Sequence, residues 1–125
     1  MTEQPKAAAE PWPTEISLAK SKMDLSIAFD DGAKFTIPAE LLRVMSPSAE
    51  VQGHSASQRV TVPGKANVKI AAVEPIGNYA VLIRFDDGHA TGFYRWSYLY
   101  DLGARYETHW QTYLDELAAK GLGRR

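Results

Sequence analysis

One short motif occurs twice in this chain and constrains the fold more than any other feature. Ile27-Ala-Phe29-Asp-Asp-Gly32 recurs as Ile83-Arg-Phe85-Asp-Asp-Gly88. In both copies apolar residues alternate at the spacing of a β-strand, and Asp-Asp-Gly then supplies the residues of a tight turn. A short helix is expected after each copy. The repetition indicates two β-hairpin-plus-helix units, although chance recurrence stays an alternative because Asp-Gly turns between apolar strands are common.

The register of the first hairpin follows from its apolar residues. A two-residue loop at Asp31-Gly32 would place Phe35 on the face opposite Ile27. A three-residue loop, with Asp30 and Asp31 in a type I turn and Gly32 in the left-handed region, pairs Ile27 with Phe35 instead. Because this register gives one apolar face, we predict the three-residue loop.

Other short elements are indicated by alternation and by residues that favour helix starts. Alternating apolar residues predict strands at 14–18 and around 68–72. Pro38 suits the first position of a helix over 39–44, because its missing N–H would be unpaired there in any case. Ser97 is a good N-cap for the second short helix.

The C-terminal part of the chain predicts a longer amphipathic helix. From about residue 105 to 120, aromatic residues and leucines recur at helical spacing, and Gly121 is placed to end the helix. Its aromatic face is expected to pack on the sheet, with a partner groove as the alternative. We therefore predict an α+β fold, with an antiparallel or mixed sheet of about five to six strands built from the two units and this helix packed on it.

Length and composition bound the domain organisation. The 125 residues, 45% of them hydrophobic, suffice for one core. We expect a flexible tail at 1–13, a single domain at 14–121 and a frayed basic tail at 122–125. Fourteen basic and fifteen acidic residues give a net charge of -1, which argues against a nucleic-acid or membrane-surface binder. The short apolar runs and the N-terminus lacking signal-peptide character lead us to expect a cytoplasmic protein.

The residue types also exclude several kinds of chemistry. The chain has no cysteine, so it cannot supply a disulfide, a thiolate nucleophile or a thiolate ligand to zinc or an iron–sulfur cluster. It also lacks a nucleophile elbow, a Walker A loop and a dinucleotide fingerprint.

Two histidines are the candidates for a metal site. His54 lies in the long irregular stretch 45–67, where a functional loop is expected. His89 directly follows the second Asp-Asp-Gly turn. Together with a carboxylate such as Glu50 or Asp87, they could bind iron or zinc. The alternative is that both are ordinary polar loop histidines, since their spacing specifies no metal.

A second group of candidates could bind an anion or the backbone of a partner. These residues gather by sequence at the exit of the first predicted helix: Arg43, Ser46, Ser48, Gln52 and Gln58. Trp96 joins the candidate binding residues, because strand alternation would place it beside Tyr94 on one face of the sheet.

Several separated motifs, taken in order, resemble one bacterial family. The motifs are Leu41-Leu-Arg-Val-Met-Ser-Pro-Ser-Ala-Glu-Val-Gln-Gly-His54, Gly77-Asn-Tyr-Ala80, Phe85-Asp-Asp-Gly-His89, Gly92-Phe-Tyr-Arg-Trp96 and Tyr98-Leu-Tyr100. Over about residues 14 to 121 they resemble the small proteins named for similarity to the N-terminal domain of gamma-butyrobetaine hydroxylase. That family has long been described as a domain of unknown function.

The resemblance has implications for zinc and for catalysis. In gamma-butyrobetaine hydroxylase and its trimethyllysine relative, this domain precedes an iron- and 2-oxoglutarate-dependent catalytic domain and holds a structural zinc through three cysteines and a histidine. The resemblance places the cysteines at Ser46, Ser48 and Val51 and the histidine at His89. Only the histidine is retained, and the chain shows no counterpart of the catalytic domain. Neither the zinc site nor hydroxylase activity is therefore expected here.

A similar domain also ends some plastid-type P-loop ATPases that carry iron–sulfur clusters. The resemblance thus implies an accessory role in iron–sulfur cluster or metal handling, with an iron–sulfur assembly ATPase as the candidate partner. We expect a non-enzymatic binding or adaptor domain whose interaction surface surrounds His54 and His89. Two alternatives stay open: a small metal-binding protein or metal-dependent enzyme that uses these histidines, and a structural domain that self-associates.

Overall fold

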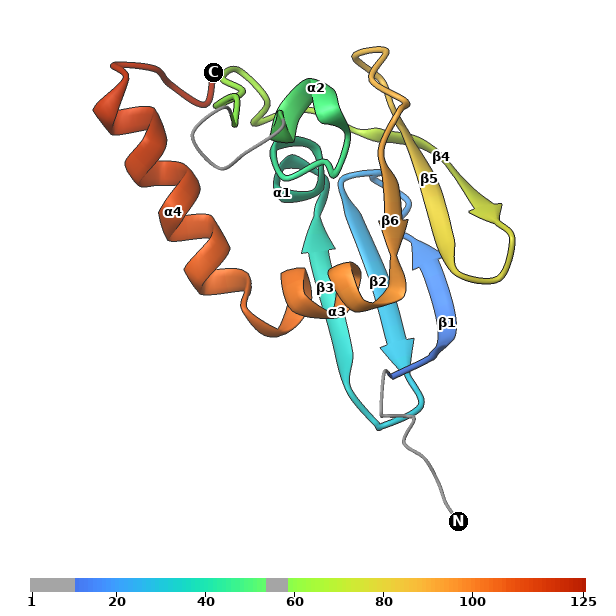
Figure 1. Cartoon of the computed structure of the whole chain (residues 1–125). Coiled ribbons are helices and arrows are strands. Elements are labelled where there is room, and N and C mark those ends of the chain that lie inside the picture. Colours follow the sequence, from blue (N-terminus) through green and yellow to red (C-terminus); the bar gives the residue numbers. More distant parts are fainter. Residues whose placement is uncertain (1–10, 54–58) are drawn as a thin grey trace.

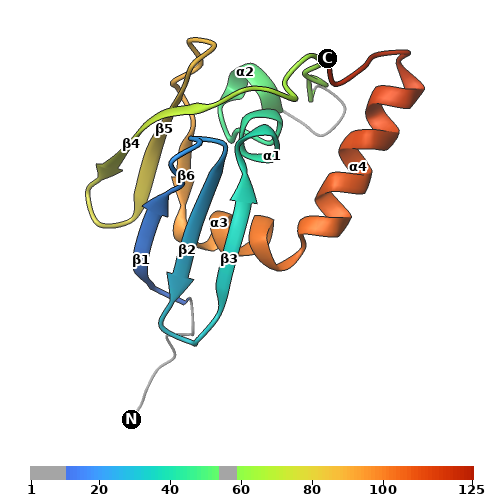
Figure 2. The same cartoon turned by 180° about the vertical axis from the view of Figure 1, so that it is seen from behind.

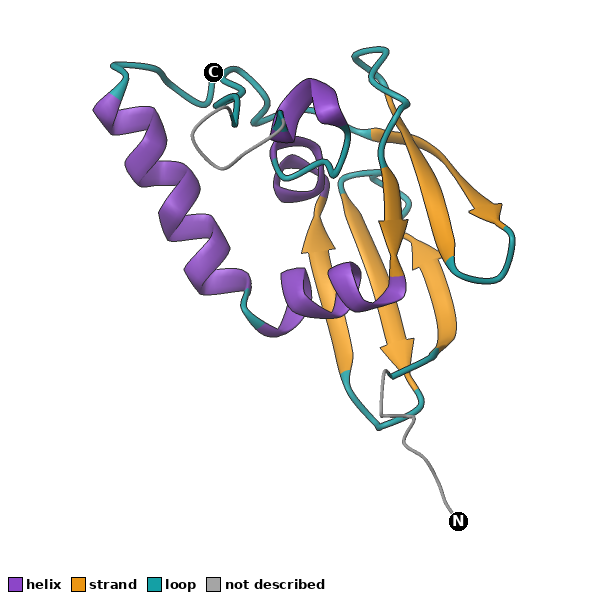
Figure 3. Cartoon of the chain, in the orientation of Figure 1, coloured by secondary structure: helices purple, strands orange, loops and turns teal. Residues whose placement is uncertain are grey.

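Two three-stranded antiparallel sheets and four helices make up the computed structural model, which describes residues 11–53 and 59–125 (Figures 1 and 3). The first sheet contains β1 (Pro13–Leu18), β2 (Asp24–Phe29) and β3 (Lys34–Pro38), and the second contains β4 (Ile70–Ile76), β5 (Ala80–Phe85) and β6 (Phe93–Arg95). The helices are α1 (Ala39–Val44), α2 (Ala49–Gln52), α3 (Trp96–Ala104) and α4 (Tyr106–Ala119). The α+β class and the strand number are as predicted, and the strands divide between two sheets.

The two Asp-Asp-Gly turns have the same geometry. In each turn the phenylalanine N–H donates to the carbonyl of the residue after the glycine, at 2.8 Å in the first and 3.0 Å in the second. Gly32 and Gly88 adopt φ values of 92° and 93°, which residues with a Cβ rarely take. The register pairs Ile27 with Phe35. The three-residue loop predicted for the first hairpin is confirmed.

Each turn belongs to a repeated unit of three strands and a helix. The first unit runs β1-β2-β3-α1 and the second runs β4-β5-β6-α3, and in both the helix follows the third strand directly. The helix predicted over 39–44 is confirmed. The second helix begins at Trp96 and not at a Ser97 cap, because β6 continues straight into it and Arg95 takes the capping position without a side-chain bond.

The two sheets share one apolar core. The inner face of the first sheet supplies Leu25, Ile27 and Phe29, and that of the second supplies Ile83 and Phe85, all of them buried. α3 crosses the inner face of the first sheet near β3, as the opposite views in Figures 1 and 2 agree. A shared core couples the stability of the two units.

α4 covers the end of the core away from the second sheet. Its side chains Tyr113 and Leu117 are buried in the same core, and the Tyr113 hydroxyl donates to the carbonyl of Val62 at 2.8 Å. The predicted C-terminal helix and its packing are therefore confirmed. In Figure 1 the helix stands beside α1 and α3, which are its main contacts.

The segments that flank the predicted domain also make contacts. Trp12 exchanges hydrogen bonds with Asp30, of 2.8 and 3.1 Å, while residues 1–10 lie outside the described part of the chain. Near the other end, the Arg124 guanidinium binds the Glu40 carboxylate, which is buried, through bonds of 2.9 and 2.8 Å. The backbone carbonyl of Gly123 also accepts a hydrogen bond. Residues 122–124 therefore make contacts that a frayed tail would lack.

None of the helices in the described ranges has the length and apolar character needed to cross a membrane.

The shared core predicts a large effect for Phe85→Ala. Phe85 is 3% exposed, so its truncation is expected to lower the free energy of unfolding by about 3 to 5 kcal/mol. Phe93→Ala, at a 51% exposed position, is the control and is expected to cost less than about 1 kcal/mol. Denaturant unfolding measures both, and an equal loss in the two variants would contradict the placement of Phe85 in the core.

Candidate functional site

The chain between α1 and α2 folds back on itself through polar contacts. The Ser48 N–H donates to the Ser46 hydroxyl at 3.2 Å, and the Ser48 hydroxyl accepts from the Glu50 N–H, which caps α2. The Gln52 side-chain amide donates to the Ser46 carbonyl at 2.9 Å. These local bonds place both serine hydroxyls toward the second sheet.

The second Asp-Asp-Gly turn presents His89 to these serines. The carboxylate of Asp87 accepts the His89 N–H at 3.0 Å, and Gly88 provides the left-handed backbone that the turn needs. The equivalent residue of the first turn is Ala33, bonded in the same way to Asp31. One turn geometry thus carries a small residue in the first unit and an imidazole in the second.

Five side chains then form what we call the polar joint: Ser46, Ser48, Glu50, His89 and Thr91. The Ser46 hydroxyl lies 2.8 Å from His89 Nε2, and the hydroxyls of Ser48 and Thr91 lie 2.8 Å apart. Glu50 Oε1 lies 3.3 Å from His89 Nδ1. Ser46, Ser48 and His89 are at least nine-tenths buried, whereas Glu50 and Thr91 are exposed, so solvent reaches the joint only from the sides of these two residues.

His89 is held in its neutral form. Burial lowers the pKa of His89, the nearby Arg43 charge lowers it further, and Glu50 and Asp87 oppose the shift. In the neutral ring, Nδ1–H can donate to Glu50 while Nε2 accepts from the Ser46 hydroxyl. Both ring nitrogens are then satisfied, so the histidine is not placed to act as a free base.

Close packing surrounds the joint on the side of β6. A Cβ on Gly92 would lie 2.5 Å from the Ser46 hydroxyl, so only glycine fits there without a shift. The hydroxyl of Tyr94, which is fully buried, donates to the Leu42 carbonyl, and burial raises the pKa of Tyr94 far above its ordinary value. These contacts fix β6 against the end of α1.

A cluster of charges lies next to the joint. Asp87 Oδ2 is 2.7 Å from both Arg43 Nε and Lys65 Nζ. Burial raises the pKa of Asp87, but hydrogen bonds from Lys65, the His89 N–H and Arg43 hold it well below the ordinary value. Asp87 therefore serves as an anion that joins α1 to the turn, and its engaged oxygen is not free for a metal.

The structure separates the predicted site residues into three groups. Ser46, Ser48, Gln52 and His89 meet at the polar joint, with Arg43 beside them. His54 lies outside the described residues, as does Gln58. Trp96 opens α3 and contacts Trp12, and the predicted pairing with Tyr94 on one face fails because β6 ends at Arg95.

Some contacts at the joint were not predicted from the sequence. Thr91 and Gly92 were not singled out, although the glycine two residues before a buried tyrosine is a weak signal of close packing. Glu50 was named only as a metal ligand, whereas here it pairs with His89.

The residues do not fit the zinc site that the resemblance implies in the hydroxylases. Val51 offers only hydrocarbon and is 2% exposed, and the Ser46 hydroxyl is already bonded to the imidazole. A neutral hydroxyl is also a far weaker ligand than a thiolate. Among the described residues, no cluster of three or more histidine, aspartate or glutamate side chains could hold a metal ion.

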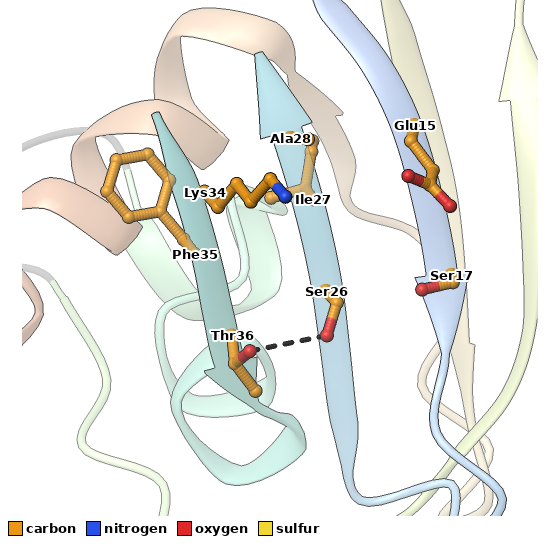
Figure 4. A pocket seen from close by; sticks show the side chains of 8 residues that line it. All are labelled: Glu15, Ser17, Ser26, Ile27, Ala28, Lys34, Phe35 and Thr36. Atoms are coloured by element: carbon orange, nitrogen blue, oxygen red, sulfur yellow. Dashed lines mark hydrogen bonds between the residues drawn. The ribbon is translucent and has the colours of Figure 1, made fainter. Parts of the chain in front are cut away.

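A separate shallow hollow lies on the outer face of the first sheet (Figure 4). Residues of β1, β2 and β3 line a volume of about 230 Å³. The hydroxyls of Ser26 and Thr36 are 3.3 Å apart and satisfy each other. None of the residues that line this hollow has a buried charge or a buried polar atom without a hydrogen bond, so we do not assign it a ligand.

The fold and the polar joint define a small α+β domain of two repeated units held together by hydrogen bonds. The family model described as gamma-butyrobetaine hydroxylase-like, N-terminal, matches residues 16–100. The chain belongs to this family.

Solved structures agree with this assignment. Two proteins with NMR solution structures are 45% and 47% identical to the chain, each with a TM-score of 0.79; the matches cover 91% and 99% of this chain and 90% of each protein. A crystal structure from Acidithiobacillus ferrooxidans, of a protein of unknown function in the DUF971 family, is 36% identical with a TM-score of 0.57, covering 70% of this chain and 86% of that one. No curated protein matches the chain significantly.

The close packing of the joint predicts the effect of Gly92→Ala. The added methyl group would overlap the Ser46 hydroxyl, so the free energy of unfolding is expected to fall by about 1 to 3 kcal/mol. Gly123→Ala, where a Cβ meets nothing closer than 3.9 Å, is the matched control. Denaturant unfolding measures the stability of both variants. A Gly92→Ala variant as stable as the parent chain would mean that the joint packs loosely.

The lowered pKa of His89 predicts a pH dependence of stability. As pH falls through about 6.5, the unfolded histidine takes up a proton while the folded ring stays neutral, so the free energy of unfolding decreases. His89→Gln removes this contribution and should show a shallower decrease between pH 7.5 and 5. Urea titrations at a series of pH values give the free energy of unfolding of both proteins. The same dependence of that free energy on pH in the two proteins would contradict the buried neutral ring.

The donor set predicts the outcome of metal analysis. After incubation with zinc or iron under anaerobic conditions and desalting, we expect the chain to retain far less than one ion per molecule. The triple variant Ser46→Cys, Ser48→Cys, Val51→Cys, with His89 unchanged, is expected to retain about one zinc ion, since it restores three thiolates and an imidazole. Stoichiometric metal in the parent chain that is lost in His89→Ala would contradict this account.

Proposed function

We propose that the chain is a non-enzymatic binding module that docks on a partner protein. The observation that carries the proposal is an exposed group of aromatic residues with one arginine, which we call the aromatic surface: Trp12, Tyr79, Phe93, Arg95 and Trp96. Trp12 and Phe93 are half exposed and Tyr79 is 41% exposed. Aromatic and arginine side chains dominate the binding energy of protein interfaces.

Contacts from three parts of the chain hold the aromatic surface together. Trp12, before β1, meets the ring of Trp96 edge to face with centroids 6.4 Å apart. The Trp96 indole N–H donates to the Asn78 carbonyl at 2.9 Å, and the Arg95 guanidinium lies 5.0 Å from the Tyr79 ring centroid. Phe93 shares a face of β6 with Arg95. The side chains of Trp12, Tyr79, Arg95 and Trp96 are thus held by contacts within the chain, which reduces the entropy lost on binding a partner.

The polar joint supports this surface rather than forming it. Thr91 and Gly92 are anchored at the joint and directly precede Phe93, so the joint fixes the start of β6. The hydroxyls and the imidazole of the joint are bonded to one another. We therefore place the binding surface on the β6 side, next to the region around His89 that the sequence indicates.

For the partner, we propose a P-loop ATPase that assembles iron–sulfur clusters, with the chain as a cytoplasmic accessory in cluster handling. The support is the resemblance to domains that end some ATPases of this kind. Because the chain has no cysteine, its contribution would be to position the partner and not to ligate a cluster.

Calorimetric titration of a bacterial iron–sulfur P-loop ATPase with the purified chain tests this proposal. Phe93→Asp and Arg95→Ala are each expected to weaken binding at least about tenfold, because both residues lie in the aromatic surface. Val60→Asp is the matched control, since Val60 is 47% exposed and outside that surface.

Each other outcome rejects a defined part of the proposal. No binding to the ATPase rejects that partner, and equal binding by the parent chain and the two variants rejects the aromatic surface. A dimer in solution that Phe93→Asp dissociates would assign the surface to a second copy of the chain.

A further inference from the structure

An apolar groove runs between the outer edges of the two sheets. β1 is an edge strand of the first sheet and β4 is an edge strand of the second. The groove has a volume of about 360 Å³ and is lined by Ile16, Ser17, Leu18, Leu25, Val73, Pro75 and Val81. Apart from one serine, every lining side chain is apolar. Figure 2 shows β1 and β4 on the same side of the molecule.

The hydrogen-bond pattern shows which backbone groups of β1 face the groove. The Ala19 N–H donates to the Asp24 carbonyl at 3.0 Å, so this pair is a hydrogen-bonded pair of the antiparallel ladder. Ser17, opposite Ser26, continues the same pattern because such pairs alternate. The N–H and C=O groups of Ile16 and Leu18 therefore point away from β2, toward the open edge.

The two edges differ in their capacity to pair. β4 contains Pro75, which has no N–H, and proline is a common device for blocking an exposed edge. β1 has no proline between Thr14 and Leu18. Within the described ranges β1 pairs only with β2, so its second edge is open to another strand.

Charge distinguishes the two ends of the groove. At one end the Ile70 N–H donates to the Lys22 carbonyl at 2.8 Å, which joins the turn between β1 and β2 to the start of β4. Lys20, Lys22 and Lys69 are exposed there, and none of them takes part in the ion pairs of the described residues. A ligand in the groove would meet unpaired positive charge at this end.

We propose that the open edge of β1 receives an extended segment of a partner protein as an added strand, with apolar residues at alternate positions and acidic residues at the end beside the lysines. Its backbone would pair with Ile16 and Leu18. Its inward side chains would extend the inner face of the first sheet and contact Val73 and Val81 across the groove. This site is distinct from the aromatic surface and does not depend on it.

Selection from a random nonapeptide library displayed on phage tests the proposal with a defined probe. Enriched peptides are expected to alternate apolar and polar residues and to carry acidic residues at one end. With the enriched peptide bound, hydrogen exchange followed by NMR is expected to slow at least about tenfold at the Ile16 and Leu18 amides, with little change at Ser17, already bonded to β2.

Variants separate the edge from the rest of the surface. Val73→Lys places a charge in the groove and is expected to weaken binding of the selected peptide at least about tenfold. Thr36→Lys, exposed on β3, is the matched control. The double variant Lys20→Glu, Lys22→Glu leaves the core untouched and is expected to weaken acidic peptides, so it decides the question even if Val73→Lys does not fold.

Three results would overturn the proposal. The first is no enrichment, and the second is enrichment of peptides whose binding neither the Val73→Lys nor the lysine variants change. The third is protection of the Ile16 and Leu18 amides in the free protein at concentrations where it forms a dimer. That result would assign the edge to a second copy of the chain.

Discussion

The hydrogen bond between the Ser46 hydroxyl and His89 Nε2 connects the two repeated units of this fold. The first unit ends in α1, and the second turns from β5 to β6 at Asp87 and His89. The ion pair of Arg43 with Asp87 reinforces the connection at 2.7 Å. Because Ser46 and His89 are buried, either would be costly to leave unpaired, so their hydrogen bond favours a single arrangement of the two sheets. The position of β6, and with it the exposed Phe93, depends on that arrangement.

Local features of the fold could be predicted from the pattern of neighbouring residues, and contacts between distant segments could not. The Asp-Asp-Gly turns, the pairing of Ile27 with Phe35 and the helix over 39–44 follow from neighbouring residues, and the structure confirms them. The meeting of Ser46 with His89 depends on how two sheets pack, which spacing along the chain does not encode. Only the family resemblance, which groups Ser46 with His89 as counterparts of zinc ligands, indicated that the two lie close together. Ser97 was wrong as a cap because tertiary structure runs β6 directly into α3.

Only part of the candidate site could be predicted from the sequence, for the same reason. Ser46, Ser48 and Gln52 were grouped because they are close in sequence, and the structure keeps them together. The role of the serines changes, because their buried hydroxyls are bonded to His89 and Thr91, hold the fold and offer little to a ligand. The exposed surfaces that could bind one, around Phe93 and along β1, are formed where sheet edges meet, so a pattern within one segment gives little sign of them.

The state of the His89 imidazole tests this account most directly, since both its burial and its partners determine where its proton lies. Long-range ¹H–¹⁵N correlation NMR at neutral pH reads the protonation of each ring nitrogen. We predict a neutral ring with the proton on Nδ1, facing Glu50, and with Nε2 accepting from Ser46. A ring protonated on both nitrogens, or one that exchanges freely between tautomers as in solvent, would contradict a buried imidazole held by Ser46 and Glu50.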